Sequence, residues 1–174
     1  GGSGPRRAGA RRIRPTRSGI CPPARPAAMM LFMNVQAHGV DMVECARIAE
    51  AVEKHGDHFL RRVFTAEELA YCDARPKRRV EHLAGRFAAK EAVLKVLGTG
   101  WARGINWTDI AVRNEPSGQP HVRLTGRCGQ IAAERGLRRV LISISHIGTH
   151  AIASAIGVGP GAGGAGPATA ADGA

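Results

Sequence analysis

The sequence predicts an α+β fold in which antiparallel hairpins pack against one long helix. Two pairs of alternating apolar and polar segments, 105–113 with 121–125 and 140–145 with 150–158, are separated by turn residues rather than by a helix. Strands joined by a short turn pair antiparallel, whereas parallel strands need a long crossover. A helical pattern over 80–97 is the longest in the chain. Together these observations exclude a doubly wound parallel sheet.

A strand and a helix are predicted ahead of the hairpins. The strand covers 30–40 and ends in the triplet 39–41. A helix over 43–54 is indicated by apolar residues at i, i+3, i+4 and i+7. Gly56 marks its predicted stop.

Shorter helices are predicted on either side of the first hairpin. Thr65 and Glu68 have the spacing of a capping box, which predicts the start of a helix that the Arg75-Pro76 pair closes. A last helix is predicted over 127–135, between the two hairpins.

Low-complexity segments flank the patterned sequence. Residues 1–35 contain seven arginines and no acidic residue, and 159–174 consist mostly of Gly, Ala and Pro. Neither segment can bury enough apolar surface to offset the entropy of ordering it, so both are predicted to be disordered tails. The predicted folded unit is one domain over 36–158. It is only mildly basic, although the whole chain has a net charge of +11.

The arginine-rich segment supports two interpretations. Its composition resembles a nucleic-acid-binding arm or an organellar transit peptide. It lacks an amphipathic period, however, and Met29, Met30 and Met33 stand where the patterned sequence begins, so it also fits a non-native extension upstream of the true start. No apolar run of the length of a secretory signal follows the arginines, which argues against secretion.

Composition excludes several classes of protein. No run approaches the roughly 18 apolar residues needed to cross a bilayer, so a membrane-spanning protein is excluded. The four cysteines lie far apart without a CxxC pair, which excludes a zinc ribbon and argues against a disulfide scaffold. A reducing compartment, and hence the cytoplasm, is expected.

The long helix carries a carboxylate on its apolar stripe. The stripe runs through Val80, Ala84, Phe87 and Leu94, and Glu91 falls on it. A carboxylate there is partly desolvated and needs a cation, a donor or a protonated state. Arg86 and Lys90 lie one turn apart on the flank, and Lys95 lies one turn beyond Glu91. The pattern fits a catalytic site, and it equally fits a Glu91–Lys95 i,i+4 pair with solvated basic neighbours.

A second carboxylate, Asp41, ends the predicted first strand. With Glu44 three residues later, it fits a helix N-cap with a capping-box partner, the commoner role for such an aspartate. Asp41 and Glu91 brought together would nonetheless suit Mg²⁺, which takes one or two protein carboxylates along with substrate phosphate oxygens. The backbone of 98–100, after the helix end, could approach a phosphate, although Gly-Thr-Gly alone is a weak pattern.

His146 is the third candidate. It follows an alternating strand and begins a tight hairpin, so its side chain is expected near a loop rather than in the core. His146 and His150 have the i, i+4 spacing of a helical metal pair, but they flank a turn, which disfavours a zinc site.

Four motifs occur in the order and spacing of a known family. They are Gly-Val-Asp-Met-Val-Glu at 39–44, Arg-Phe-Ala-Ala-Lys-Glu-Ala at 86–92, Gly-Thr-Gly at 98–100 and Ser-Ile-Ser-His at 143–146. Over about 36–158 the chain resembles the holo-[acyl-carrier-protein] synthases, the small type of the 4′-phosphopantetheinyl transferase superfamily. The resemblance implies that family's fold, a role in fatty acid biosynthesis, and a homotrimer with its active sites between neighbouring subunits.

The resemblance also implies roles for individual residues. Asp41 and Glu91 would hold Mg²⁺, and Lys95 would meet the pyrophosphate or protonate the leaving group. His146 would bind the phosphates of coenzyme A, and Arg47 of the first helix would meet the acidic acyl carrier protein. The other coenzyme-binding residues would be Lys77, Arg78, Arg79, Arg86, Lys90, Gly98, Thr99 and Gly100.

The reaction implied by the resemblance suits these residue types. A serine hydroxyl of the carrier protein attacks the phosphopantetheine phosphoryl group of coenzyme A, and 3′,5′-ADP leaves. Such a transfer needs alignment and neutralised oxygens more than covalent chemistry from the protein. Glu91 or a metal-bound water would take the serine proton. The positive charge of the core would steer an acidic carrier protein toward the site.

A basic nucleic-acid-binding module is the alternative function. It would use the arginine-rich arm and the basic cluster at 75–79 on phosphates. Against it, the core has few aromatic residues and no basic stripe interleaved with them. The transferase is therefore the favoured hypothesis.

Overall fold

The computed structural model describes residue 1 and residues 33–100 and 104–160. The predicted tails, including the arginine-rich arm, lie almost wholly outside these residues. The chain divides into the units Gly1–Met30 and Leu31–Ala174, and the elements described below belong to the second. In chain order they are β1 (Met33–Glu44), α1 (Cys45–Val63), α2 (Ala66–Asp73), η1 (Pro76–Arg78), α3 (Arg79–Leu97), η2 (Trp107–Asp109), β2 (Ile110–Asn114), β3 (Pro120–Leu124), α4 (Gly126–Glu134), β4 (Arg139–His146) and β5 (His150–Pro160).

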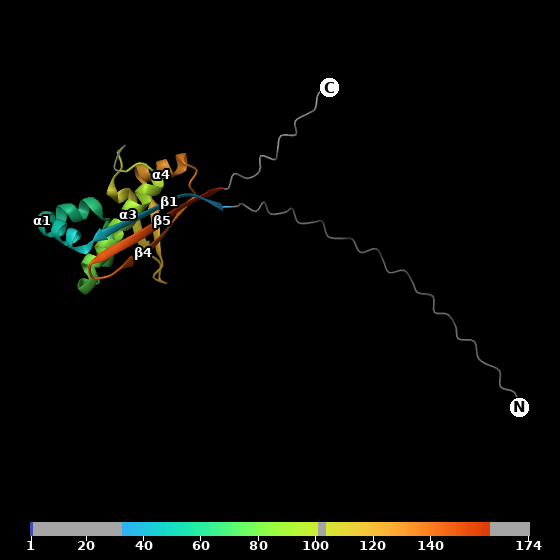
Figure 1. The fold of residues 1–174 in the computed structure, drawn as a ribbon, viewed down its shortest axis with the longest axis horizontal. Coiled ribbons are helices and arrows are strands. Elements are labelled where there is room, and N and C mark those ends of the chain that lie inside the picture. The colour runs from blue at the N-terminus through green and yellow to red at the C-terminus, as the bar shows by residue number, and fades with distance from the viewer. Residues whose placement is uncertain (2–32, 101–103, 161–174) are drawn as a thin grey trace, which may run out of the picture. The chain divides into compact units, whose positions relative to one another are not determined.

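The strands form two antiparallel sheets. The larger has the order β1-β5-β4, and the smaller is the hairpin β2-β3. α3 lies along the larger sheet, while α1 and α2 gather at one end of it (Figure 1). The predicted α+β class, both hairpins and the long central helix are therefore confirmed.

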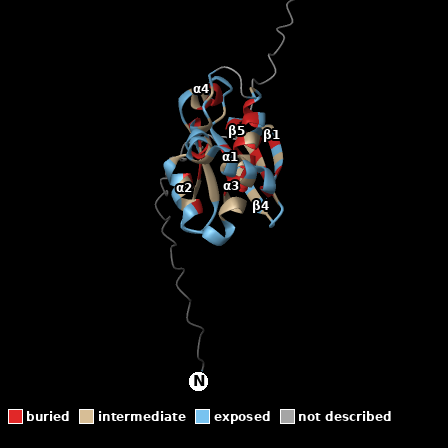
Figure 2. Cartoon of the chain, turned by 90° about the vertical axis from the view of Figure 1, so that its left-hand side faces the viewer, coloured by how far each residue is buried: buried red, intermediate tan, exposed pale blue. Residues whose placement is uncertain are grey.

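Small residues allow α3 to lie unusually close to the larger sheet. A Cβ on Gly39 of β1 would strike the carbonyl of Ala92, and one on Gly85 of α3 would come within 2.9 Å of Ile144. Alanines line both surfaces of this contact and are fully buried: Ala88, Ala89 and Ala92 on α3, and Ala151, Ala153 and Ala155 on β5. Buried residues accordingly concentrate where α3 meets the sheet (Figure 2). Close packing of this kind fixes the distance between backbone elements with little freedom to relax.

Two predicted boundaries near the first strand are wrong. β1 continues to Glu44 because it pairs with β5 as far as the Glu44–His150 partners. Asp41 therefore lies inside a strand, and its predicted role as an N-cap is wrong. The N-cap of α1 is Glu44, and the backbone N–H of Cys45 donates to the carbonyl of Thr149 at 2.8 Å.

Gly56 kinks the first helix instead of ending it. Its φ of 51° lies in the left-handed region, yet α1 resumes and runs to Val63. Leu60 and Val63 are buried, so the second part of α1 gains apolar burial that a loop would forgo.

The smaller elements follow the predictions more closely. Thr65 and Glu68 form the predicted capping box of α2. β2 begins at Ile110 rather than 105, because a 3₁₀ turn capped by Asn106 and Asp109 occupies the preceding residues.

The outer face of the larger sheet exposes apolar side chains. Val40, Met42, Leu141 and Ile152 are all exposed, Met42 to 64 %. Strand register places these four on the face opposite the buried alanines. No helix of the described residues has the length and apolar content to span a bilayer.

Candidate active site

β1 and α3 bring Asp41 to Lys95. Nζ of Lys95 lies 2.9 Å from Oδ1 of Asp41 and also donates to the carbonyl of Val40. Glu91 is half-buried one turn before Lys95 on the same helix. We call Asp41, Glu91 and Lys95 the carboxylate cluster.

The alternation of β1 explains how this cluster forms. Gly39 and Val43 are buried against α3, so Asp41 between them also faces the helix. The contact of Gly39 with Ala92 sets the separation of strand and helix beside Asp41.

The end of α3 presents backbone and hydroxyl groups next to Lys95. Gly98 terminates the helix in the left-handed conformation, with φ of 61°. The guanidinium of Arg135 lies against Gly98 and donates to the carbonyl of Val96 at 3.2 Å. Within the described residues, the buried Oγ1 of Thr99 has no hydrogen-bond partner. A buried hydroxyl without a partner is a position where a bound phosphate oxygen fits.

A second group of polar side chains lies at the start of α3. Oε2 of Glu81 lies 2.9 Å from Nδ1 of His146 and 3.0 Å from Nη2 of Arg78. The ring of His82 meets that of His146 edge to face, with centroids 5.1 Å apart. We call Arg78, Glu81, His82 and His146 the histidine cluster.

A cavity of about 190 Å³ opens beside this cluster. Arg86 lines it, stacked 3.9 Å above the Tyr71 ring and donating to Asn114 at 2.8 Å. Arg86 is only 4 % exposed, and within the described residues its buried Nε has no partner. Lys77 and Arg78 line an adjoining groove of about 480 Å³ with Arg75, Pro76 and His82. The combined surface suits an anionic ligand.

Two pKa values in the histidine cluster are shifted. The hydrogen bond from Arg78 holds the pKa of the Glu81 carboxyl below its ordinary value, with a further contribution from His146. Burial lowers the pKa of His82, and the positive charges of its neighbours act in the same direction. Both shifts favour an ionised carboxylate beside a neutral His82 at neutral pH.

The expectation that Arg86 and Lys90 are solvated neighbours on the helix flank is wrong. Lys90 is completely buried, and its Nζ lies 2.9 Å from Oε2 of Glu68. It also donates to the carbonyls of Trp107 and Ile110. α2 and η2 cover this flank, so Lys90 holds them to α3 and presents no surface to a ligand.

Asp41 and His146 approach α3 at different positions. His146 lies over Gly85, whereas Asp41 lies at Lys95. These two positions of α3 are ten residues apart, which corresponds to about 15 Å along a helix. Asp41 of β1 and His146 of β4, predicted for one site, therefore lie at separate parts of α3, with Glu91 between them.

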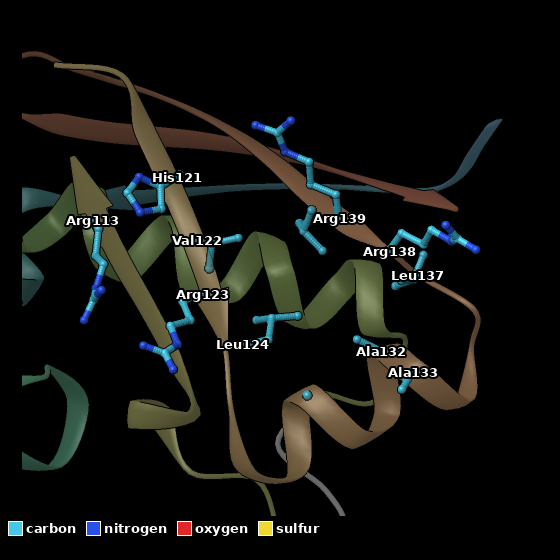
Figure 3. Close-up of a pocket in the computed structure, with 12 residues that line it drawn as sticks. Arg113, His121, Val122, Arg123, Leu124, Ala132, Ala133, Leu137, Arg138 and Arg139 are labelled. Carbon is cyan, nitrogen blue, oxygen red and sulfur yellow. The ribbon is translucent and has the colours of Figure 1, made fainter. Parts of the chain in front are cut away.

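A separate cleft of about 480 Å³ lies elsewhere, between β3, α4 and the start of β4. Figure 3 shows Arg123, Arg138 and Arg139 around it, together with Arg113 and His121. Arg113 is paired with Glu67 at 2.6 Å. None of the residues predicted from the sequence lines this cleft, so it is not the candidate site.

Sequence reasoning missed several residues of the histidine cluster and its cavity. Arg78 and Glu81 have the i, i+3 spacing of an ion pair, which could have indicated Glu81. Tyr71, His82 and Asn114 carry no comparable local pattern, because tertiary packing alone brings them together. Arg47, predicted to meet a carrier protein, is exposed on α1.

Comparison with known proteins identifies the family of the chain. Residues 37–153 match the family model of the 4′-phosphopantetheinyl transferase superfamily. The chain is 49 % identical over 122 residues to the holo-[acyl-carrier-protein] synthase of Desulforudis audaxviator, covering 70 % of this chain and 92 % of that one. It is 43 % identical over 118 residues to that of Koribacter versatilis, covering 68 % and 94 %.

Solved structures are similar over the same region. The holo-[acyl-carrier-protein] synthase of Neisseria meningitidis superposes with a TM-score of 0.65 at 31 % identity, covering 71 % of this chain and 98 % of that one. The Helicobacter pylori synthase, solved in complex with coenzyme A, gives a TM-score of 0.61 at 28 % identity, covering 69 % and 98 %.

Proposed function

The chain belongs to the 4′-phosphopantetheinyl transferase superfamily, among its holo-[acyl-carrier-protein] synthases, and we propose that it transfers phosphopantetheine from coenzyme A to a serine of an apo acyl carrier protein, with release of 3′,5′-ADP. The observation that carries this proposal is the contact of Asp41, in the motif at 39–44, with Lys95, one turn after Glu91 of the motif at 86–92. Coenzyme A in the Helicobacter pylori structure supports it as the co-substrate.

The carboxylate cluster supplies the groups that phosphoryl transfer needs. Lys95, held beside Asp41, lies where it can neutralise charge that develops on the leaving pyrophosphate oxygen. Glu91 is the side chain of this cluster that can accept the proton of the attacking serine. The Thr99 hydroxyl and the backbone N–H of Gly100 would offer further hydrogen bonds to phosphate oxygens.

The donor chemistry of the carboxylate cluster fits Mg²⁺. Asp41 and Glu91 would hold the ion, which prefers oxygen ligands and commonly takes one or two protein carboxylates. In the described part of the chain, no group of three or more His, Cys, Asp or Glu side chains is placed to hold a metal by itself. Phosphate oxygens of the substrate and water would therefore complete the coordination. When bound, the ion would neutralise negative charge on the pyrophosphate.

The basic surface at the start of α3 is proposed to bind the remainder of coenzyme A. Lys77 and Arg78 of the groove suit the 3′-phosphate, and His146 and Arg86 suit the other phosphates. The exposed Arg47 on α1 is proposed to meet the acidic carrier protein.

The proposed active unit is a homotrimer with each site shared between neighbouring chains. The exposed apolar face of the larger sheet supports association, because an apolar patch of this kind is typical of an interface. The separation of the carboxylate and histidine clusters along α3 supports a shared site. One chain would supply the carboxylate cluster, and its neighbour would supply the histidine cluster.

Incubation with apo acyl carrier protein, coenzyme A and Mg²⁺ tests the proposed function. Mass spectrometry of the carrier should show the gain of one phosphopantetheine group. Glu91→Gln should reduce turnover by about 100-fold or more, while Glu53→Gln, an exposed position on α1, should leave it unchanged. A carrier that gains no mass with any divalent metal would refute the transferase. Near-normal turnover of Glu91→Gln would refute the role assigned to that carboxylate.

A further inference from the structure

Glu81 joins two coenzyme-binding residues that come from distant parts of the chain. Arg78 belongs to η1 and His146 ends β4, yet both contact the same oxygen, Oε2 of Glu81. Nη2 of Arg78 also lies 3.1 Å from Nδ1 of His146. The three side chains therefore form one compact unit at the mouth of the cavity and the groove.

The contact determines which edge of His146 faces a ligand. Nδ1 is directed at Glu81, while Cδ2 lies over Gly85, 3.9 Å from the position of a Cβ there. Among the described residues, Nε2 of His146 has no hydrogen-bond partner, and the histidine lines the cavity. A carboxylate on one imidazole nitrogen fixes the orientation of the ring and leaves the other nitrogen for the ligand.

The same carboxylate restrains Arg78. Its side chain is 56 % exposed, so little packing restricts its rotamers apart from the two hydrogen bonds from Nε and Nη2 to Glu81. A long exposed side chain loses rotamer freedom when it binds a ligand, and restraining it beforehand reduces that loss.

We propose that Glu81 is a positioning residue for coenzyme A, which holds Arg78 for the 3′-phosphate and His146 for a second phosphate without touching the coenzyme itself. This inference rests on the proposed function. It predicts that loss of the Glu81 charge weakens coenzyme binding while the chemical step, which belongs to the carboxylate cluster, continues.

Glu81→Gln is the test, because glutamine preserves the shape of the side chain and removes its charge. We expect the KM for coenzyme A to rise about fivefold to tenfold, because Arg78 and His146 regain conformational freedom that coenzyme binding must then restrict. We expect kcat and the KM for the carrier protein to stay within about twofold of the wild-type values. The preference for coenzyme A over 3′-dephospho-coenzyme A should narrow, since Arg78 is no longer held for the 3′-phosphate. A merely structural role would not change this preference.

Glu134→Gln is the matched control, since Glu134 forms a 2.9 Å ion pair with Arg127 on α4, away from both clusters. It should leave every constant unchanged. An unchanged KM in Glu81→Gln, an equal loss with both coenzymes, or a loss confined to kcat would overturn the inference. A wild-type enzyme that fails to use coenzyme A would instead refute the proposed function, so the two failures are distinguishable.

Discussion

Lys90→Met should destabilise the protein severely, and because Lys90 is completely buried, the coenzyme-binding role that the resemblance implied for it is not supported. Lys90 and Glu68 are both buried, with side chains 0 % exposed, and their charged atoms are 2.9 Å apart. Nζ of Lys90 also donates to the carbonyls of Trp107 and Ile110. The pair thereby ties α2 and the start of β2 to α3.

The size of this loss of stability follows from the interactions that the substitution removes. Methionine fills most of the lysine volume, but it leaves the Glu68 carboxylate buried without a counter-ion and removes the hydrogen bonds from Nζ to the carbonyls of Trp107 and Ile110. Glu68 keeps hydrogen bonds from the backbone N–H groups of Thr65 and Val112. Removing one partner of a buried ion pair costs about 3–5 kcal/mol of the free energy of unfolding. In a domain of this size, that corresponds to a fall in Tm of roughly 10–20 °C.

Chemical and thermal unfolding of a double-mutant cycle measures this effect. Lys90→Met with Glu68→Gln should cost less than the sum of the single changes, by about 1–3 kcal/mol, because both charges are then absent. Asp57→Asn is the control: its 3.0 Å pair with Arg61 is exposed and should contribute under about 1 kcal/mol. A Lys90→Met protein within 1 kcal/mol of wild type, or strictly additive changes, would contradict the reasoning.

Three further predictions concern the packing, pH response and assembly of the protein. Gly39→Ala forces a methyl group against the Ala92 carbonyl, so it should lower the free energy of unfolding by about 1–3 kcal/mol and reduce transfer activity. Gly148→Ala is the control, because its methyl group meets no neighbour within 4 Å, and it should change neither stability nor activity. Burial lowers the pKa of His82, so below about pH 6.5 the unfolded chain binds more protons than the folded protein, and stability should fall as the pH drops through the folded-state pKa. Replacing His82 with Phe should flatten this fall in a series of Tm measurements, and an unchanged slope would refute the assignment. Light scattering at micromolar concentration should give a mass near three chains for the wild type. Met42→Lys places a charge on the exposed sheet face and should give a lower mass. A fully active monomer would rule out the shared site.

Local sequence patterns predicted the elements whose ends depend on local chemistry. The Thr65 capping box began α2 as expected, and the turn residues between the strands marked both hairpins. Gly98 ends α3, whose helical pattern was predicted over 80–97, because a left-handed terminal residue favours glycine.

Tertiary contacts overruled local patterns elsewhere. Asp41 has the local pattern of a helix cap, but pairing with β5 keeps it in a strand. Lys90 falls on the flank of a helical wheel drawn for α3 alone, and only the covering by α2 and η2 makes that flank interior. The predicted apolar stripe of α3 likewise describes only part of its buried surface. Phe87 on the stripe is only partly buried, whereas Ala88 and Ala89 beside it are completely buried. A helix enclosed on several sides does not show a single apolar face.

The candidate site residues also divide into those that the local sequence indicates and those that only tertiary packing brings together. Asp41, Lys95 and His146, named from the sequence, lie on β1, α3 and β4, and the structure brings Asp41 and Lys95 together. Glu81, His82 and Tyr71 join the histidine cluster through packing between segments far apart in sequence. Spacing along one chain does not encode such contacts.

The distance between the carboxylate and histidine clusters along α3 has a genetic consequence. If each site is shared between neighbouring chains as proposed, two inactive proteins, one altered at Asp41 and the other at His146, would each lack a different half of every site. If their subunits exchange at random in a trimer, about a quarter of the sites in an equal mixture combine two intact halves. Two defective alleles expressed in one cell would thus restore part of the activity that neither provides alone, and an allele defective in both clusters would rescue neither.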